Sequence, residues 1–408
     1  MMTLEIVYFF YMFVSLFFLA LFLSIYFHNR KTLFFIPTLT KNHSLSVLVP
    51  AYNEQNTIEG TIEHIFASDY KGLLEVIAIN DGSTDNTLQV LSKLQKKYKK
   101  LVVINKANSG KASSLNYALK LVKGDFVAII DADSYPDKKA FSQLMGFFSD
   151  QKVGAVTAAC TPMNRKSLLE RLQTIEFKVI AFTRKLLEYI DSIYVAPGSL
   201  SVYRLKALKE AGGFDSKNLT EDIESTWHLL SMGWKVKMCL AATVRTVVPN
   251  TFKAWWIQRV RWTVGGFQVL KKYRKDLFKK GMFGYFVIPF FIFGLTIGIL
   301  GVGIFFWIYM IRLFQRMEIV FYKMDAGVPL VALQDLNITP SVLNYFGIVL
   351  FIIFFLFTIF VLMAMKDDVL KKQKTYEILL YSTMYLIAYP FMIIWSVYKW
   401  SRGYNRWR

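Results

Sequence analysis

"FVAIIDADSYP" covers residues 126–136, and it decides how the middle of the chain is interpreted. Five apolar residues, typical of a buried strand, end in Asp131 and Asp133, which are separated by one residue. Because side chains alternate along an extended segment, both carboxylates are expected on the same side of the chain. Strands of a parallel sheet are buried on both faces and read as continuous apolar runs. We therefore expect a strand that presents two carboxylates at the rim of a parallel sheet.

Three similar apolar runs precede this strand, and segments of helical composition separate them. The strands are expected at 45–54, 74–80, 101–105 and 125–130, and the helices at 57–67, after Ser83 or Thr84 as N-cap, and at 113–122. Strands that alternate with helices of about 10–15 residues indicate a parallel sheet with right-handed crossovers. The expected fold class is α/β, Rossmann-like, with a mostly parallel sheet.

Polar residues follow three of these strands, at 52–54, 80–83 and 131–134. In open α/β sheets, ligands bind beyond the carboxyl ends of the strands. Each motif alone is equally well explained as a turn former or a helix cap. Three such motifs at one edge of the sheet favour a ligand site.

The two aspartates suggest a metal site at that edge. Two carboxylates suit Mg²⁺ or Mn²⁺, which typically bind one or two of them together with substrate phosphates. Segment 108–114, "NSGKASS", resembles a phosphate loop, but Asn105 stands where a Walker motif requires glycine, so the chain is not a P-loop NTPase. Lys111 remains a candidate phosphate ligand as a point charge.

Three later segments carry further candidates. In 218–230, Thr220 is expected to cap a helix whose first turn holds Glu221, Asp222 and Glu224. These acidic residues either offset the helix dipole or, in the case of Asp222, supply a general base. Segment 252–267 places three tryptophans and two arginines within eight positions, which is typical of an interfacial helix and also suits sugar binding. The third segment has an apolar stripe at helical spacing and either lies on a membrane surface or closes the core; its positions are 168, 172, 175, 179, 182 and 186.

Long apolar runs lie at the two ends of the chain, which has 408 residues, is 54% hydrophobic and carries a net charge of +20. The first run, 4–27, is long enough to span a bilayer and lacks the features of a cleaved signal peptide. Three later runs are also long enough, at 282–310, 343–365 and 377–400. Basic residues cluster beside these runs, which favours membrane flanks over binding of nucleic acid. Cys160 and Cys239 are expected to be reduced core residues, because no zinc-binding spacing is present.

The basic clusters also predict orientation. Those at 271–280 and 366–374 fall on the same side as the middle domain, which the positive-inside tendency places in the cytoplasm. The basic tail, which includes Arg406 and Arg408, falls on the other side. Pro390 is therefore interpreted as the mark of a broken or re-entrant last segment.

The motifs occur in a diagnostic order: "AYNE", "INDGSTDNT", "GKASSLN", "DADS", "TED" and "QRVRW". In this order they resemble the membrane-integrated family 2 glycosyltransferases, which have a GT-A catalytic domain and include cellulose, hyaluronan and poly-N-acetylglucosamine synthases. The last motif is similar to the Gln-x-x-Arg-Trp signature of that family. Segments 154–165, 173–177 and 248–266 look most like the poly-N-acetylglucosamine synthases.

The resemblance implies a role for each matching residue. Tyr52, Glu54 and Asp81 would hold the nucleoside of a UDP-sugar. Lys111 and Asp131 would lie near its diphosphate, and Asp133 would hold Mg²⁺ or Mn²⁺. Asp222 would be the catalytic base. The residues that would position the diphosphate and the acceptor sugar are Glu221, Gln258, Arg261 and Trp262.

The resemblance also implies a function and an organisation. The expected protein is an inverting transferase of the cell membrane that adds a sugar, with UDP-N-acetylglucosamine as the best donor, to a growing β-linked polysaccharide. Membrane lipids and an accessory membrane subunit are the further expected partners. Transfer to a polyprenyl phosphate or another lipid, and a non-catalytic polysaccharide-binding or export scaffold, stay open. The expected regions are an anchor at 1–30, a cytoplasmic GT-A domain at 31–250, an interfacial helix at 251–281 and a region of further transmembrane helices, about four in all, at 282–408.

Overall fold

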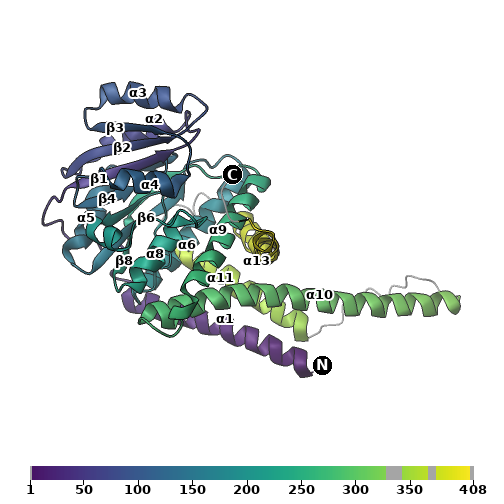
Figure 1. Ribbon diagram of the computed structural model, residues 1–408. Coiled ribbons are helices and arrows are strands. Elements are labelled where there is room, and N and C mark those ends of the chain that lie inside the picture. The colour runs from purple at the N-terminus through teal and green to yellow at the C-terminus, as the bar shows by residue number, and fades with distance from the viewer. Residues whose placement is uncertain (1, 328–341, 366–373, 405–408) are drawn as a thin grey trace.

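A computed structural model describes residues 2–327, 342–365 and 374–404. An α/β domain occupies one end of the molecule, and long helices extend away from it (Figure 1). The basic residues Lys366, Lys371, Lys372, Arg406 and Arg408, used above to predict orientation, lie outside the described residues.

The centre of the domain is an eight-stranded sheet in the order β3-β2-β1-β4-β7-β6-β8-β5. Strand β1 is parallel to β2 and β4, β2 is parallel to β3, and β7 runs antiparallel between β4 and β6. The strands are β1 Leu45–Ala51, β2 Leu73–Asp81, β3 Leu101–Lys106, β4 Phe126–Ile129, β5 Ser134–Pro136, β6 Val153–Pro162, β7 Ser201–Arg204 and β8 Lys235–Thr246. The expected α/β class with a mostly parallel sheet is confirmed.

Helices cover both faces of this sheet, which explains the continuous apolar strands. Along β1, Val47 and Val49 point into one core with α2, α3 and α5, whereas Leu48 points into a second core with α4, α6 and α8. The helices of the domain are α2 Ile58–Phe66, α3 Thr87–Lys97, α4 Lys111–Leu119, α5 Ala140–Met145, α6 Leu168–Glu188, α7 Leu205–Glu210, α8 Glu221–Ser231 and α9 Phe252–Tyr273. Cys160 and Cys239 are buried free thiols, as expected.

Helix α3 begins later than the sequence predicts, so the expected cap at Ser83 or Thr84 is wrong. The backbone N–H of Thr84 donates to the side chain of Asn53, 2.8 Å away. The carboxylate of Asp85 instead accepts from the N–H of Thr87, at 3.0 Å, where the helix starts. A contact with the loop after β1 therefore overrides the local capping preference.

Helix α6 begins with a capping box, in which Ser167 and Glu170 exchange hydrogen bonds with each other's backbone. Its predicted apolar stripe is largely buried, with Ile175 and Phe182 fully covered. The helix packs on β6 and β8 and also contacts α11 and α13. Of the two roles expected for this helix, it therefore has the one that closes the core. It also joins the sheet to the apolar helices.

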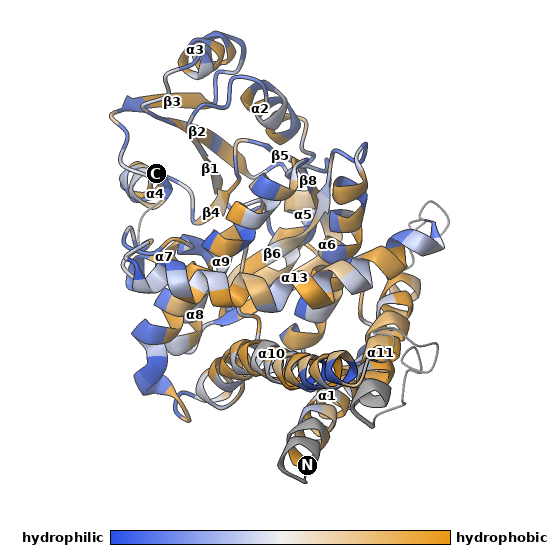
Figure 2. Ribbon diagram, turned by 90° about the vertical axis from the view of Figure 1, so that its right-hand side faces the viewer, coloured by the Kyte–Doolittle hydropathy of each residue, from blue (hydrophilic) through white to orange (hydrophobic). Residues whose placement is uncertain are grey.

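Three described helical segments are long and apolar enough to cross a membrane: Phe9–Asn29, Phe283–Asp325 and Thr375–Ser401. They belong to α1 Met2–Asn29, to the π-helix Phe283–Val287 with α10 Ile288–Asp325, and to α13 Thr375–Ser401. The fourth expected span is α11 Val342–Ala364, in which Ile348–Ala364 is a shorter apolar helix. Figure 2 shows the hydrophobic colour along α1 and α11.

Two features of these helices differ from the expectations. Helix α10 has 38 residues and hence a length of about 57 Å, well beyond the predicted span 282–310. Its last part projects away from the rest of the molecule (Figure 1). Helix α13 is continuous through Pro390, so the expected break is absent. Helices α6, α9, α10 and α11 all pack against α13.

Candidate active site

Strand β1 delivers the first polar group at the rim of the sheet. Asn53 has a φ of 58° and turns the chain directly after Tyr52, whose side chain is 48% exposed. The carboxylate of Glu54 accepts a 2.5 Å hydrogen bond from Thr57. Burial raises the pKa of Glu54, the hydrogen bond from Thr57 opposes this, and Asp131 adds to the rise. The carboxylates that follow β1 and β4, those of Glu54 and Asp131, therefore repel each other.

Asp81 ends β2 and organises the loop that follows β3. Its carboxylate accepts hydrogen bonds from Lys106 Nζ at 2.5 Å, from Ser109 N at 3.0 Å and from Gly110 N at 2.8 Å. Burial opposes ionisation, but these bonds outweigh it and lower the pKa of Asp81. Gly110 has a φ of 88°, which favours glycine, and α4 begins at the next residue, Lys111. Asp81 therefore fixes the start of α4.

Lys111 joins segments that are far apart in the sequence. Its Nζ lies 2.6 Å from Asp131 Oδ1 and 2.7 Å from Glu221 Oε1. Burial alone would lower the pKa of Lys111, but Asp131, Glu221 and Asp222 outweigh it and raise the pKa. One ammonium group thus holds the Asp-x-Asp motif after β4 against the Glu-Asp pair of α8.

Gly198 makes room for this arrangement. A Cβ atom there would lie 2.5 Å from Lys111 Nζ and 3.0 Å from Asp131 Oδ1. Its carbonyl oxygen also accepts from the backbone N–H of Asp131, at 3.0 Å. Any side chain at this position would displace the Lys111–Asp131 pair, so Gly198 forms part of the wall of the site.

Asp133 has the electrostatics of a cation ligand. Burial, and then the carboxylates of Asp131 and Glu54, raise its pKa to about 7. Ser134 and Thr246 donate to Asp133 at 3.2 and 3.3 Å. Among the described residues, no group of three or more His, Cys, Asp or Glu is arranged to hold a metal. The donor set fits an ion such as Mg²⁺ or Mn²⁺, which takes one or two carboxylates and completes its shell with phosphate and water.

The pKa values of the two acidic residues that begin α8, Glu221 and Asp222, are shifted in opposite directions. The Lys111 contact outweighs burial and lowers the pKa of Glu221. Burial, and then the charge of Glu221, raise the pKa of Asp222 to about 6, although Lys111 and Arg261 oppose the rise. Neighbouring carboxyls whose pKa values are pushed apart are typical of acid–base sites. Asp222 therefore has the properties of a general base near neutral pH.

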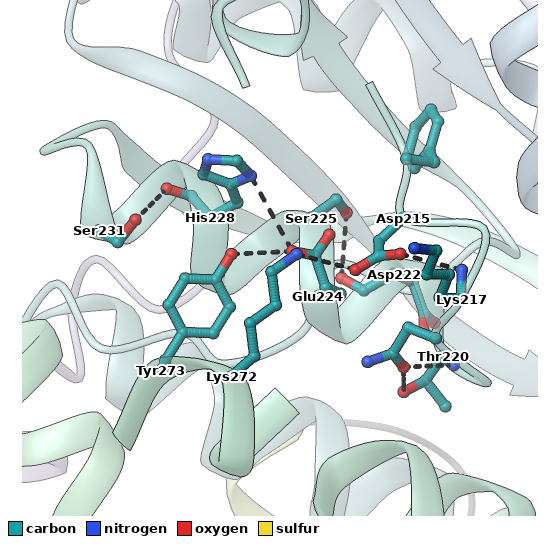
Figure 3. A network of polar contacts seen from close by, with 12 residues as sticks. Asp215, Lys217, Thr220, Asp222, Glu224, Ser225, His228, Ser231, Lys272 and Tyr273 are labelled. Atoms are coloured by element: carbon teal, nitrogen blue, oxygen red, sulfur yellow. Dashed lines mark hydrogen bonds and ion pairs between the residues drawn. The ribbon is translucent and has the colours of Figure 1, made fainter. Parts of the chain in front are cut away.

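Helix α8 is fastened to α9 through Glu224, as Figure 3 shows. Glu224 is 1% exposed, and its Oε1 accepts from Lys272 Nζ at 2.6 Å and from Tyr273 Oη at 2.8 Å. Lys272 also donates to Asp215 Oδ2 at 2.8 Å. From the sequence, Glu224 was considered only as a charge that offsets the dipole of α8. The structure shows that it also binds two residues of α9. Glu224, two positions after Asp222 along α8, therefore ties this helix to α9.

Thr220 occupies the N-cap position of α8, as expected, but its side chain does not cap the helix. Its hydroxyl donates to Asn218 Oδ1 at 3.1 Å instead. A Cβ atom on Gly265 would lie 2.2 Å from that hydroxyl, so α9 approaches the start of α8 closely at a glycine.

Helix α9 carries the tryptophan-rich segment past the site. Arg261 Nη1 donates to the carbonyl of Leu219 at 3.2 Å, and its charge acts on Glu221 and Asp222. Gln258 accepts from Arg259, whose guanidinium lies 4.1 Å from the ring centroid of Trp262. Arg261 is thus brought to the carboxylates, whereas Gln258 and Trp262 are grouped around Arg259.

The chain was compared with known proteins. A model of the family described as "Glycosyltransferase like family 2" matches residues 43–265, which is more than half of the chain. The chain belongs to this family. The expected resemblance and the enzyme class, a glycosyltransferase, are confirmed.

Two curated relatives of this family 2 chain are named poly-beta-1,6-N-acetyl-D-glucosamine synthase. The one from Staphylococcus aureus strain MSSA476 is 33% identical over 257 residues, covering 60% of this chain and 62% of the relative. The one from Staphylococcus epidermidis is 33% identical over 228 residues and 55% of each chain. The match thus spans about three-fifths of these relatives' length or less.

A solved structure agrees with the fold. The mannosyltransferase PcManGT from Pyrobaculum calidifontis, in complex with GDP-Man and Mn²⁺, superposes with a TM-score of 0.52 at 22% identity, covering 67% of this chain and 75% of its own. This similarity concerns the architecture of the domain.

The family 2 site also depends on residues that the motifs did not single out. They are Gly198, Glu224 and a buried ion pair between Arg259 and Glu176. Arg259 lies inside "QRVRW" and Glu176 inside "QTIEF". Both segments were recognised from the sequence, but the ion pair between them was not predicted. Two of them gave a local signal: Arg259, a charge within a tryptophan-rich segment, and Glu224, an acidic residue in the first turn of α8.

Proposed function

We propose that the chain transfers a sugar from a UDP-sugar to a growing β-linked polysaccharide, with UDP-N-acetylglucosamine as the donor. The observation that carries this proposal is the contact of Lys111 with both Asp131 and Glu221, which gathers the diphosphate-side and base-side motifs into one cluster. The relatives named poly-beta-1,6-N-acetyl-D-glucosamine synthase support the choice of sugar and product.

The proposed reaction is a direct displacement at the anomeric carbon. Asp222 removes the proton of the acceptor hydroxyl while the hydroxyl oxygen forms a bond to that carbon, and the bond to the UDP oxygen breaks on the opposite side. An α-linked donor therefore gives a β-linked product. Lys111 and Arg261 place positive charge where the diphosphate departs, and such preorganised charge is often the largest contribution to catalysis.

Asp133, with Asp131 beside it, is proposed to hold Mg²⁺ or Mn²⁺. A divalent ion bound there neutralises charge on the diphosphate. The raised pKa of Asp133 and the Mn²⁺ in the Pyrobaculum structure support the assignment. Excess EDTA should remove activity and added Mn²⁺ or Mg²⁺ should restore it; full activity in EDTA would contradict the assignment.

The remaining family residues are proposed to bind the nucleoside of the donor, its diphosphate and the acceptor sugar. Tyr52, Glu54 and Asp81 lie at the rim of β1 and β2 and are assigned to the nucleoside. Asp81 would then contact the nucleoside in addition to Lys106, Ser109 and Gly110 of the loop after β3. Glu221, Gln258 and Trp262 are assigned to the diphosphate and the acceptor sugar.

The surroundings are proposed to be the cell membrane, crossed by the apolar helices, with the catalytic domain in the cytoplasm. The four regions expected from the sequence are retained in this proposal. Membrane lipids and an accessory membrane subunit are the further proposed partners.

Two alternatives differ in what the site does. Transfer of one sugar to a polyprenyl phosphate or another lipid would use the same Asp-x-Asp cluster, but Gln258, Arg261 and Trp262 favour a polymer. A non-catalytic polysaccharide-binding or export scaffold would have no need for Asp222 with its raised pKa.

Purified full-length protein, incubated with Mn²⁺ and a panel of UDP-sugars, tests the proposal. We expect UDP release with UDP-N-acetylglucosamine and a β-linked product of many sizes. A single lipid-linked sugar would replace the polymer proposal with the lipid alternative. Absence of UDP release from every donor, in protein that still binds UDP, would support the scaffold.

A further inference from the structure

A cavity of about 390 Å³ lies where α9 meets α10 and α13 (Figure 2). This volume is within the range of pockets that hold small organic molecules. Among the described residues that line the cavity, none belongs to the candidate active site. The apolar part of the wall comes from all three helices and from the segment that joins α9 to α10, and it consists of Phe267, Leu270, Leu277, Ile292 and Trp400.

Two cations complete the lining of this cavity, Lys271 and Arg274. They are three positions apart, so they lie on the same face of the chain where α9 ends. Within residues 2–327, 342–365 and 374–404, neither side chain makes a hydrogen bond or an ion pair. The nearby carboxylate of Asp276 pairs with Lys280 instead, at 3.2 Å. The cavity therefore has two like charges on its wall that no acidic side chain compensates.

The cavity lies at the ends of two apolar helices. Ile292 is in the second turn of α10 and Trp400 is in the last turn of α13, and both helices belong to segments that are apolar enough to cross a membrane. The ring of Trp400 packs 5.5 Å from that of Phe267, and Lys271 Nζ lies 5.9 Å from the centroid of the Trp400 ring. Tryptophan rings and cations at the ends of membrane helices are typical of the headgroup level.

An anionic phospholipid matches both parts of this lining. Its phosphate oxygens accept charge-assisted hydrogen bonds from lysine and arginine, and its acyl chains match an apolar wall. Free phosphate would leave the apolar wall without a partner, and a lipid with a cationic headgroup would bring a further positive charge to the two cations. Basic pockets between membrane helices are typical binding sites for anionic headgroups.

We propose that this cavity binds one anionic phospholipid, with its phosphate on Lys271 and Arg274 and an acyl chain against Leu270, Ile292 and Trp400. The inference rests on the membrane location proposed above, but not on the sugar that is transferred. It goes beyond a general contact with membrane lipids, because it assigns a site and requires a net negative charge on the lipid.

The site has a consequence for the stability of the protein. Lys271 precedes Lys272 and Tyr273, which hold Glu224 of α8. A lipid in the cavity therefore contacts the end of α9 that is fastened to the helix of the candidate base. Because a ligand that binds only the folded chain raises its thermal midpoint, an anionic lipid should stabilise the protein.

The test compares two lipids with the same acyl chains, phosphatidylglycerol and phosphatidylcholine, which are titrated into the full-length chain in detergent. Native mass spectrometry counts the bound lipids, and thermal unfolding without lipid shows that each variant is folded. The pair Lys271→Gln and Arg274→Gln removes the two lining cations. The matched control is Lys275→Gln with Lys279→Gln, which removes the same charge from exposed lysines of the same segment that do not line the cavity.

We expect wild type to bind phosphatidylglycerol at least about tenfold more tightly than phosphatidylcholine, because each basic residue contributes about fivefold to the attraction of an anionic lipid. The lining pair should lose most of this preference and the stabilisation by phosphatidylglycerol, whereas the control pair should keep both within about twofold. Ile292→Trp, which fills the cavity and retains its charges, should also weaken binding of phosphatidylglycerol.

Three results would overturn the inference. Equal affinity of wild type for the two lipids would show that no negative charge is required. Equal losses in the lining pair and the control pair would show that only the overall charge of the segment matters. Inorganic phosphate that raises the thermal midpoint as much as phosphatidylglycerol would show a phosphate site rather than a lipid site. None of these results would affect the proposed sugar transfer, which UDP release tests separately.

Discussion

Arg259 in α9 and Glu176 in α6 form a buried ion pair, with 2.9 Å between Arg259 Nε and Glu176 Oε1, and both residues are 2% exposed. Glu176 also accepts from Tyr385 at 2.6 Å and from Tyr389 at 2.8 Å, both in α13. One carboxylate therefore ties the motif helix and the amphipathic helix α6 to an apolar helix at the end of the chain. This places the candidate active site at the junction with the apolar helices.

Removing Glu176 should destabilise that junction. Glu176→Ala leaves the guanidinium of Arg259 buried without a counter-charge, which typically costs about 3–5 kcal/mol. Glu63→Gln, which breaks the exposed pair with Lys97, should cost about 1 kcal/mol or less. Denaturant unfolding of the solubilised chains compares the two. Equal losses would show that the Arg259–Glu176 pair contributes no more than a surface contact.

Lys111 should be required for the chemical step. Lys111→Met removes the charge that Asp131 and Glu221 share, and the loss of one preorganised donor typically lowers kcat about 10²–10³-fold. Steady-state UDP release measures the effect, and Lys93→Met, an exposed lysine of α3, is the control. A kcat within a few-fold of wild type would remove Lys111 from the leaving-group side.

The pH profile should report Asp222. Its raised pKa, about 6, means that the carboxyl is ionised and able to accept a proton above pH 6 and becomes protonated below it. We therefore expect kcat/KM to be flat near pH 7–8 and to fall about tenfold per pH unit below about 6. Initial rates between pH 5 and 8 would show this. A profile that stays flat down to pH 5 would exclude Asp222 as the base at its raised pKa.

The link between α8 and α9 should affect turnover more than UDP binding. Glu224→Gln removes the charge that Lys272 and Tyr273 contact, which allows Asp222 to shift relative to α9. Displacements of this size at a catalytic group cost up to about 10²-fold in rate. Kinetics together with UDP binding are compared with Asp215→Asn, which removes only the more exposed partner of Lys272. Equal effects of the two variants would show that Glu224 has no special part.

Local patterns in the sequence were sufficient to predict the four strands β1 to β4 and the order of the motifs, whereas β5 to β8 of the eight-stranded sheet were not predicted. Apolar strands such as 125–130 and the polar residues that follow them depend on neighbours in the sequence, so the rim of the sheet was predictable. Asn53 displaced the start of α3, and Glu176 found its partners in α9 and α13, through contacts that only the folded chain creates. The length of α10 was missed because charged residues such as Arg312 follow its apolar part, whereas helix continuation depends on the backbone rather than on hydropathy.

The central claim is that Asp222 is the base of a glycosyl transfer at the site assembled around Lys111. Asp222→Asn keeps the size of the side chain but removes its ability to take a proton. UDP release and polymer formation by this variant, with UDP binding measured on the same preparation, test the claim most directly. We predict that transfer falls at least about 10³-fold while the affinity for UDP stays within a few-fold of wild type. Transfer at the wild-type rate in Asp222→Asn would contradict the claim.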